Sequence, residues 1–320
     1  MNLLAIVVAL AIEQWRSFEW RASVEHAFVA YARGIERRLN GGTLGQGIVA
    51  TVLAIAPPVA ASVIAWWLLH DLHPFAGFVV NVVVLYALMG FRRFSHALSA
   101  IISALKSADL PGARRSLAAW DGGSAGELSS QDVARIAIER GLADAYRQVF
   151  AVLFWFVVLP GPAGAVLYRA AALLASEWKG ALPGDDMTVL ARSLAVFGRP
   201  ARLVLCVLDW IPARLTALSF AIVGDFEDAA FCWRTQARTW PEAYGGEAIG
   251  VVLASAAGAL GVQLGGARPG YGGESDPRPE IGIGDAVEAE VLPSAVGLVW
   301  RALVLWLLLV FLLSLANWAP

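Results

Sequence analysis

Residues 295–318 read AVGLVWRALVLWLLLVFLLSLANW, and this stretch decides the fold class. Its one charged residue, Arg301, lies near its start. About 20 apolar residues in an α-helix are long enough to cross the ~30 Å hydrocarbon core of a bilayer. We therefore expect a C-terminal transmembrane helix over residues 295–318. Four other apolar runs look alike and predict an all-α, polytopic helical bundle of five or six segments: residues 47–69, 74–91, 149–175 and 203–223.

The composition supports a protein that has the lipid bilayer as its main partner. Apolar residues make up 58% of the chain and charged residues 16%, against about 45–50% and about 25% in soluble domains. Several of the 13 tryptophans stand near the ends of apolar runs, as in interfacial aromatic belts. The net charge of −2 gives no reason to expect a nucleic-acid partner. Residues 1–15 lack the basic start and cleavage site of a signal peptide, and predict an uncleaved first membrane segment.

Positive charge gathers in two connecting regions, residues 13–46 and 92–148. Only residues 71–73 link the two apolar runs between them, which predicts a hairpin that returns the chain to the same side. The positive-inside rule then places both regions in the cytoplasm of a multi-pass protein of the bacterial inner membrane. Phe94, Leu98, Ile101 and Leu105 recur at helical spacing. Residues 92–148 are therefore expected to form a helical cytoplasmic insertion.

Two glycine- and proline-rich segments each leave two interpretations open. Pro160-Gly-Pro-Ala-Gly164 breaks the run at 149–175, giving either two short helices at a membrane face or a discontinuous helix that lines a cavity. Residues 265–294 form a Gly/Pro-rich acidic loop. This loop is either a flexible linker or a segment whose backbone approaches a ligand closely.

Three charges lie within apolar runs, where each costs about 2.5–3.5 kcal/mol or more and usually faces a partner or water. Asp209 and Arg214 flank a proline in LDWIPARL, and Arg169 lies in VLYRAAALLA. Asp209 is expected to pair with Arg214 or with Arg169, or else one arginine binds an anionic ligand. The sequence has no P-loop and no HExxH pattern. We therefore expect no metal site, and the sequence pattern assigns no catalytic residue.

Four motifs, in order along most of the chain, resemble the CobD/CbiB membrane family of cobalamin biosynthesis. They are LKSADLPGARRSLAAWDG at 105–122, LFWFVVLPGPAGAVLYRA at 153–170, LDWIPARLTAL at 208–218, and GALGVQLGG with YGGE within 258–274. The resemblance implies an adenosylcobinamide-phosphate synthase. Such an enzyme joins aminopropanol phosphate to a corrinoid acid by an amide bond, at the cost of ATP and with Mg²⁺.

Departures from that family pattern favour a different role. The family's acidic start is missing, and several of its polar or acidic positions are occupied by Ala143, Arg147, Ala175, Leu205 and Cys206. The LDWIPARL motif is also similar to AmpE, an inner-membrane family linked to β-lactamase induction and peptidoglycan-fragment sensing. We therefore expect a non-catalytic sensing or accessory protein. The alternative is the synthase itself.

The sequence thus predicts one CobD/CbiB-like membrane domain over residues 1–320, whose ligand is a corrinoid or a peptidoglycan-derived molecule. The candidate ligand-binding residues combine the intramembrane charges with the retained family positions. They are Glu139, Arg169, Asp209, Trp210, Arg214, Gly265, Gly266, Tyr271 and Glu274.

Overall fold

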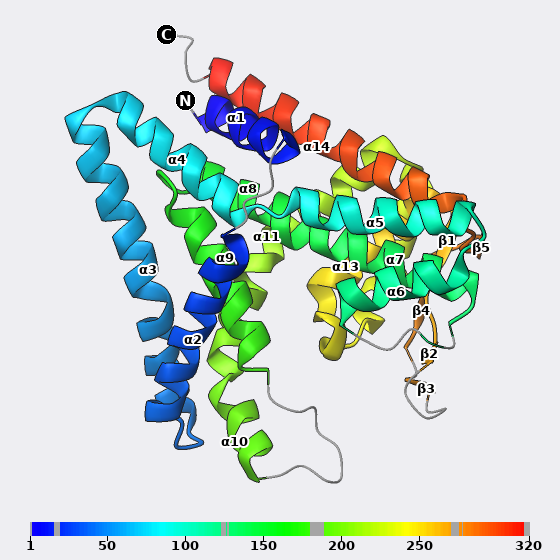
Figure 1. Cartoon of the computed structure of the whole chain (residues 1–320), viewed down its shortest axis with the longest axis horizontal. Coiled ribbons are helices and arrows are strands. Elements are labelled where there is room, and N and C mark those ends of the chain that lie inside the picture. Colours follow the sequence, from blue (N-terminus) through cyan, green and yellow to red (C-terminus); the bar gives the residue numbers. More distant parts are fainter. Residues whose placement is uncertain are drawn as a thin grey trace. The chain divides into compact units, whose positions relative to one another are not determined.

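The computed structural model describes residues 2–15, 20–122, 126, 128–179, 189–269, 275–276 and 278–316 (Figure 1). Most of this chain is helical. The helices before the proline break are α1 (Asn2–Trp15), α2 (Arg21–Leu39), α3 (Leu44–Leu72), α4 (Pro74–Leu88), α5 (Phe91–Lys106), α6 (Leu110–Asp121), α7 (Ser130–Ala145), the π-helical turn η1 (Tyr146–Phe150) and α8 (Ala151–Val158). After it come α9 (Ala163–Glu177), α10 (Val189–Phe197), α11 (Arg199–Val223), α12 (Phe226–Gln236), the 3₁₀ turns η2 (Ala237–Thr239) and η3 (Glu242–Tyr244), α13 (Gly246–Leu260) and α14 (Val291–Ala316).

Four helices among the described residues are long and apolar enough to cross a membrane. They are Leu44–Leu72, Ser130–Val158, Arg199–Val223 and Val291–Ala316. The expected all-α polytopic class is therefore confirmed. The last of these helices, α14, begins four residues before the predicted start at 295.

The 92–148 region is helical, as expected, and comprises α5, α6 and α7. Its last helix does not stop before the next apolar run. It continues through η1 into α8, so that Ser130–Val158 forms one 29-residue candidate span. The predicted boundary at 148 therefore falls inside a helix.

The chain divides into two compact units, each built from two separate stretches of sequence. The first contains Met1–Met89 with Ala151–Trp210, and the second contains Gly90–Phe150 with Ile211–Pro320. One boundary lies between α4 and α5, and the other two fall within the helices Ser130–Val158 and α11.

The first unit contains the predicted hairpin, α3 and α4, joined at His73 (Figure 1). Nδ1 of His73 accepts a hydrogen bond from the backbone N–H of Phe75 at 3.1 Å. Pro74 occupies the first turn of α4, where its missing N–H costs nothing. This local chemistry explains why so short a link makes a stable corner.

The proline-rich break separates α8 from α9 by a turn over residues 159–162. Gly161 in this turn has a φ of 61°, a left-handed conformation that favours glycine. The two helices pack against each other. The expected break is thus present as a turn between the end of the 29-residue helix Ser130–Val158 and the 15-residue helix α9.

The second unit is built around α13, whose sequence GEAIGVVLASAAGAL is rich in small residues. Small side chains let helix backbones approach closely. A Cβ added at Gly258 would lie 2.4 Å from the carbonyl oxygen of Asp228 on α12. The buried core beside it contains Cys232, Ala237, Val251 and Ala254.

The described part of the Gly/Pro-rich loop contains short strands. Strand β1 (Val262–Gly265) leaves the end of α13 and pairs antiparallel with β4 (Glu280–Ile281) and parallel with β5 (Asp285–Ala286). Strands β2 (Arg268–Pro269) and β3 (Ser275–Asp276) form a separate antiparallel pair. Strand β1 of the three-stranded sheet packs against α7, so it holds the glycine-rich segment beside the candidate site.

Candidate functional site

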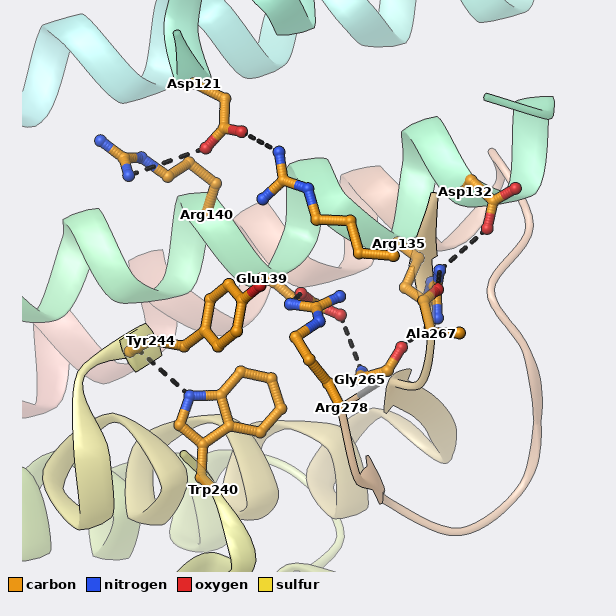
Figure 2. A network of polar contacts seen from close by, with 11 residues as sticks. Asp121, Asp132, Arg135, Glu139, Arg140, Trp240, Tyr244, Gly265, Ala267 and Arg278 are labelled. Carbon is orange, nitrogen blue, oxygen red and sulfur yellow. Dashed lines mark hydrogen bonds and ion pairs between the residues drawn. The ribbon is translucent and has the colours of Figure 1, made fainter. Parts of the chain in front are cut away.

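The centre of the site is Glu139, which is buried on α7 with 6% of its surface exposed. Its Oε2 accepts a hydrogen bond from Nη1 of Arg278 at 2.7 Å, and its Oε1 accepts one from the backbone N–H of Gly265 at 2.7 Å. A buried carboxylate needs such compensation, because an isolated buried charge is very costly. Both oxygens are therefore held by donors from one loop (Figure 2).

The loop reaches Glu139 because residue 265 is glycine. Its φ of 78° is left-handed, and a Cβ there would lie 2.1 Å from the carbonyl oxygen of Pro279. No other residue type would fit without moving the neighbouring strand. Gly266, with a φ of 73°, continues the same turn.

Arg135, one turn before Glu139 on α7, holds the same loop from the other side. It donates hydrogen bonds to the carbonyl oxygens of Gly265 and Ala267, and forms an ion pair with Asp132 at 2.9 Å. Asp132 also completes a capping box with Ser129 that starts α7. The helix start, the arginine and the glycine turn are thus one connected network.

Arg278 is the most unusual side chain of the site. Its guanidinium carbon lies 5.5 Å from the ring centre of Trp240 and 5.0 Å from that of Tyr244, both within cation–π range (Figure 2). The Arg278 side chain is only 2% exposed. The rings and Glu139 therefore fix this guanidinium in one orientation.

A second polar cluster lies further along α7. Arg140 is 3.3 Å from a carboxylate oxygen of Asp144 and 3.8 Å from one of Asp121. Asp121 also pairs with Arg268, and Asp144 accepts a hydrogen bond from Nε1 of Trp120 at 3.0 Å. Each of these acids is already engaged by a cation or donor.

The structure brings together three of the nine predicted site residues: Glu139, Gly265 and Gly266. Arg214 lies in the same unit but forms an ion pair with Glu247 at 2.8 Å. Tyr271 and Glu274 lie outside the described residues.

The remaining three predicted residues belong to the other compact unit. Asp209 accepts a hydrogen bond from the Tyr168 hydroxyl on α9 at 2.7 Å, and Arg169 forms an ion pair with Glu25 on α2 at 2.5 Å. Trp210 is 58% exposed.

Sequence reasoning missed Arg278, Trp240 and Tyr244. The aromatic pair stands in TWPEAYGGE, where a proline and two glycines mark a turn. Arg278 follows a proline in the acidic loop for which the sequence left two interpretations open. The only hint of Arg278 in the sequence was its position between two prolines in a mainly acidic loop.

Among the described residues, no group of three His, Cys, Asp or Glu side chains is placed to hold a metal ion. The donors left over at the site are guanidinium N–H groups, which suit an anionic group of a ligand.

The matches to known proteins all point to one family, CobD/CbiB. The profile of the family described as CobD/Cbib protein matches residues 5–299. A Cobalamin biosynthesis protein CobD from Stutzerimonas stutzeri is 36% identical over 309 residues, which cover 95% of each chain. One from Chromobacterium violaceum is 37% identical over 82% of this chain and 77% of its own. The Cobalamin biosynthesis protein CbiB of Salmonella typhimurium is 26% identical over 83% and 78%. No solved structure matches.

These matches overturn the expected AmpE-like sensing role. The similar curated proteins are named for cobalamin biosynthesis, and the match runs through nearly the whole chain. The substitutions at Ala143, Arg147, Ala175, Leu205 and Cys206 were therefore given too much weight.

Proposed function

Because this chain belongs to the CobD/CbiB family, we propose that it is an adenosylcobinamide-phosphate synthase of cobalamin biosynthesis. The reaction joins the carboxyl group of a corrinoid acid to the amine of aminopropanol phosphate. The observation that carries the proposal is the 36% identity over 95% of a protein named for this pathway.

The guanidinium groups of the site suit the two phosphate-bearing substrates, ATP and aminopropanol phosphate. To form the amide, the carboxyl group must lose an oxygen and the amine must lose protons. ATP can supply the phosphoryl group with which this oxygen leaves as phosphate, and ADP is the other product. Arginine side chains suit the phosphates of both substrates, because their planar fork matches phosphate oxygens.

Mg²⁺ would enter this reaction bound to ATP. Such an ion takes most of its ligands from phosphates and water, with one or two carboxylates. The described residues, which hold no three-ligand cluster, fit that arrangement better than a dedicated metal cage. We assign Glu139 to holding Arg278 and the Gly265 turn, since both its oxygens are occupied.

The test is complementation of a bacterial strain that lacks its own synthase. Growth that depends on new corrinoid synthesis should return when this gene is expressed. Supplying cobinamide, the corresponding amide without the phosphate, should restore growth of the deletion strain with or without the gene. Failure of the gene to restore growth, with the protein present in the membrane and cobinamide effective, would contradict the proposal.

We also propose that the chain crosses the bacterial inner membrane several times, with α6 on the cytoplasmic side. The basic residues of the 13–46 and 92–148 regions support this orientation. Ala119 is exposed on α6, so a cysteine there is accessible to reagents.

Cysteine labelling tests the orientation. An Ala119→Cys variant, with exposed Cys206 replaced by alanine, should react with an impermeant maleimide only after cells are permeabilised. Cys232 can stay, because burial, with a smaller effect of Asp228, raises the pKa of its thiol and keeps it protonated and unreactive. Efficient labelling in intact cells would reverse the proposed topology.

A further inference from the structure

One edge of the Arg278 guanidinium is unused. Nη1 binds Glu139, whereas Nε and Nη2 are buried and have no hydrogen-bond partner among the described residues. Nε and Nη2 form the side of the guanidinium that binds two oxygens of one carboxylate or phosphate. Leaving such donors buried and unpaired is costly, so they call for an acceptor.

A second arginine approaches the same aromatic turn. Nε of Arg147, in the turn η1, is also buried without a hydrogen-bond partner among the described residues. A Cβ added at Gly245 would lie 2.9 Å from Nη2 of Arg147. Gly245 directly follows Tyr244, whose ring faces Arg278. The Tyr244–Gly245 turn is thus approached by both guanidinium groups.

The same turn begins a helix. Gly245 is the N-cap of α13, with a φ of 108°, and offers no side chain to cap the first amides. The N-terminus of a helix carries a partial positive charge and free N–H groups, which favour anions. Glu247 in the first turn is neutralised by Arg214 at 2.8 Å.

Among the described residues, Glu139 compensates Arg278, but none of the recorded ion pairs includes Arg147. The Nε of Arg147 is nevertheless buried. A buried donor without an acceptor is costly, so this atom and the free edge of Arg278 both favour an anionic ligand.

We propose that Arg278 and Arg147, with the first turn of α13, bind a phosphoryl group of a substrate. The inference rests on the proposed synthase function for the identity of the ligand. Two substrates carry this chemistry, ATP and aminopropanol phosphate, and the experiment distinguishes them.

Arg147→Gln is the first test variant, because it removes a charge without leaving a carboxylate unpaired. Dissociation constants are measured from the melting temperature of the purified protein in detergent, titrated separately with ATP, aminopropanol phosphate and unphosphorylated aminopropanol. The affinity for one of the two phosphorylated compounds should fall by roughly 10- to 100-fold, as for a lost charged hydrogen bond. The compound affected identifies the source of the phosphoryl group.

Arg278→Lys is the second variant. It keeps a positive charge beside Glu139 but loses the paired Nε and Nη2 donors. The affinity of this variant for the same compound should therefore fall as well. Arg301→Gln serves as the matched control, since exposed Arg301 has its recorded hydrogen bond to Gly297 of its own helix, and its affinities should not change.

Unchanged affinities for both phosphorylated compounds in Arg147→Gln would overturn the inference, as would absence of phosphate-dependent binding in the unaltered protein. The two proposals can fail separately. A protein that forms the amide but is indifferent to Arg147→Gln refutes only the phosphoryl site. A protein that binds phosphate through Arg147 but forms no amide refutes only the synthase.

Discussion

Replacing Arg278 with leucine is expected to lower the free energy of unfolding by about 3–5 kcal/mol. The change leaves the Glu139 carboxylate buried, with only the Gly265 N–H as its recorded donor. It also removes the cation between Trp240 and Tyr244. Thermal unfolding of the purified protein in detergent measures the loss.

The double variant Glu139→Gln, Arg278→Leu should recover part of that stability, because it removes the uncompensated charge as well. Arg33→Leu serves as the control. Its ion pair with Glu177, at 2.5 Å, joins side chains that are 56% and 21% exposed, and exposed pairs contribute little to stability. Equal losses for Arg278→Leu and Arg33→Leu would show that the Glu139 network is not a buried ion pair.

Replacing Gly258 with valine is expected to have the second largest effect. A Cβ at this position would lie 2.4–2.6 Å from backbone atoms of Asp228 and Ala229 on α12. Backbone cannot turn aside as a side chain can, so α12 and α13 must separate. Overpacking costs about 1–3 kcal/mol or more, seen as a lower melting temperature.

Gly297→Ala is the control for this change. Gly297 is also a helical glycine, but a Cβ there would meet nothing within 4 Å. Alanine should raise stability by about 0.5–1 kcal/mol, because glycine is the poorer helix former. If Gly258→Val melted at or above the temperature of the unaltered protein, the close approach of α12 and α13 would be wrong.

The sequence allowed prediction of those features that depend on local chemistry. The corner at His73 and the break at Gly161 follow from proline and glycine, whose effects reach only a few residues. The end of the insertion was drawn at 148 because the apolar composition changes there, whereas η1 keeps the chain helical across that point.

The partners of the charged residues could not be predicted, because they come from distant parts of the chain. Glu139 and Arg278 are 139 residues apart, and Arg169 and Glu25 are 144 apart. By contrast, Gly265 and Gly266 could be selected because they lie in a motif that resembles the family, and Glu139 because it is a retained family position. Trp240, Tyr244 and Arg278 lie outside the quoted motifs, so only the folded structure brings them to the site.

The corrinoids of the complemented deletion strain test the central claim most directly. Mass spectrometry should show the corrinoid acid accumulating in the strain without the gene. With the gene, the acid should decline and its aminopropanol phosphate amide should appear. An Arg147→Gln protein present at the same level should form less of the amide. Continued accumulation of the acid, with no amide although the unaltered protein is in the membrane, would contradict the synthase account.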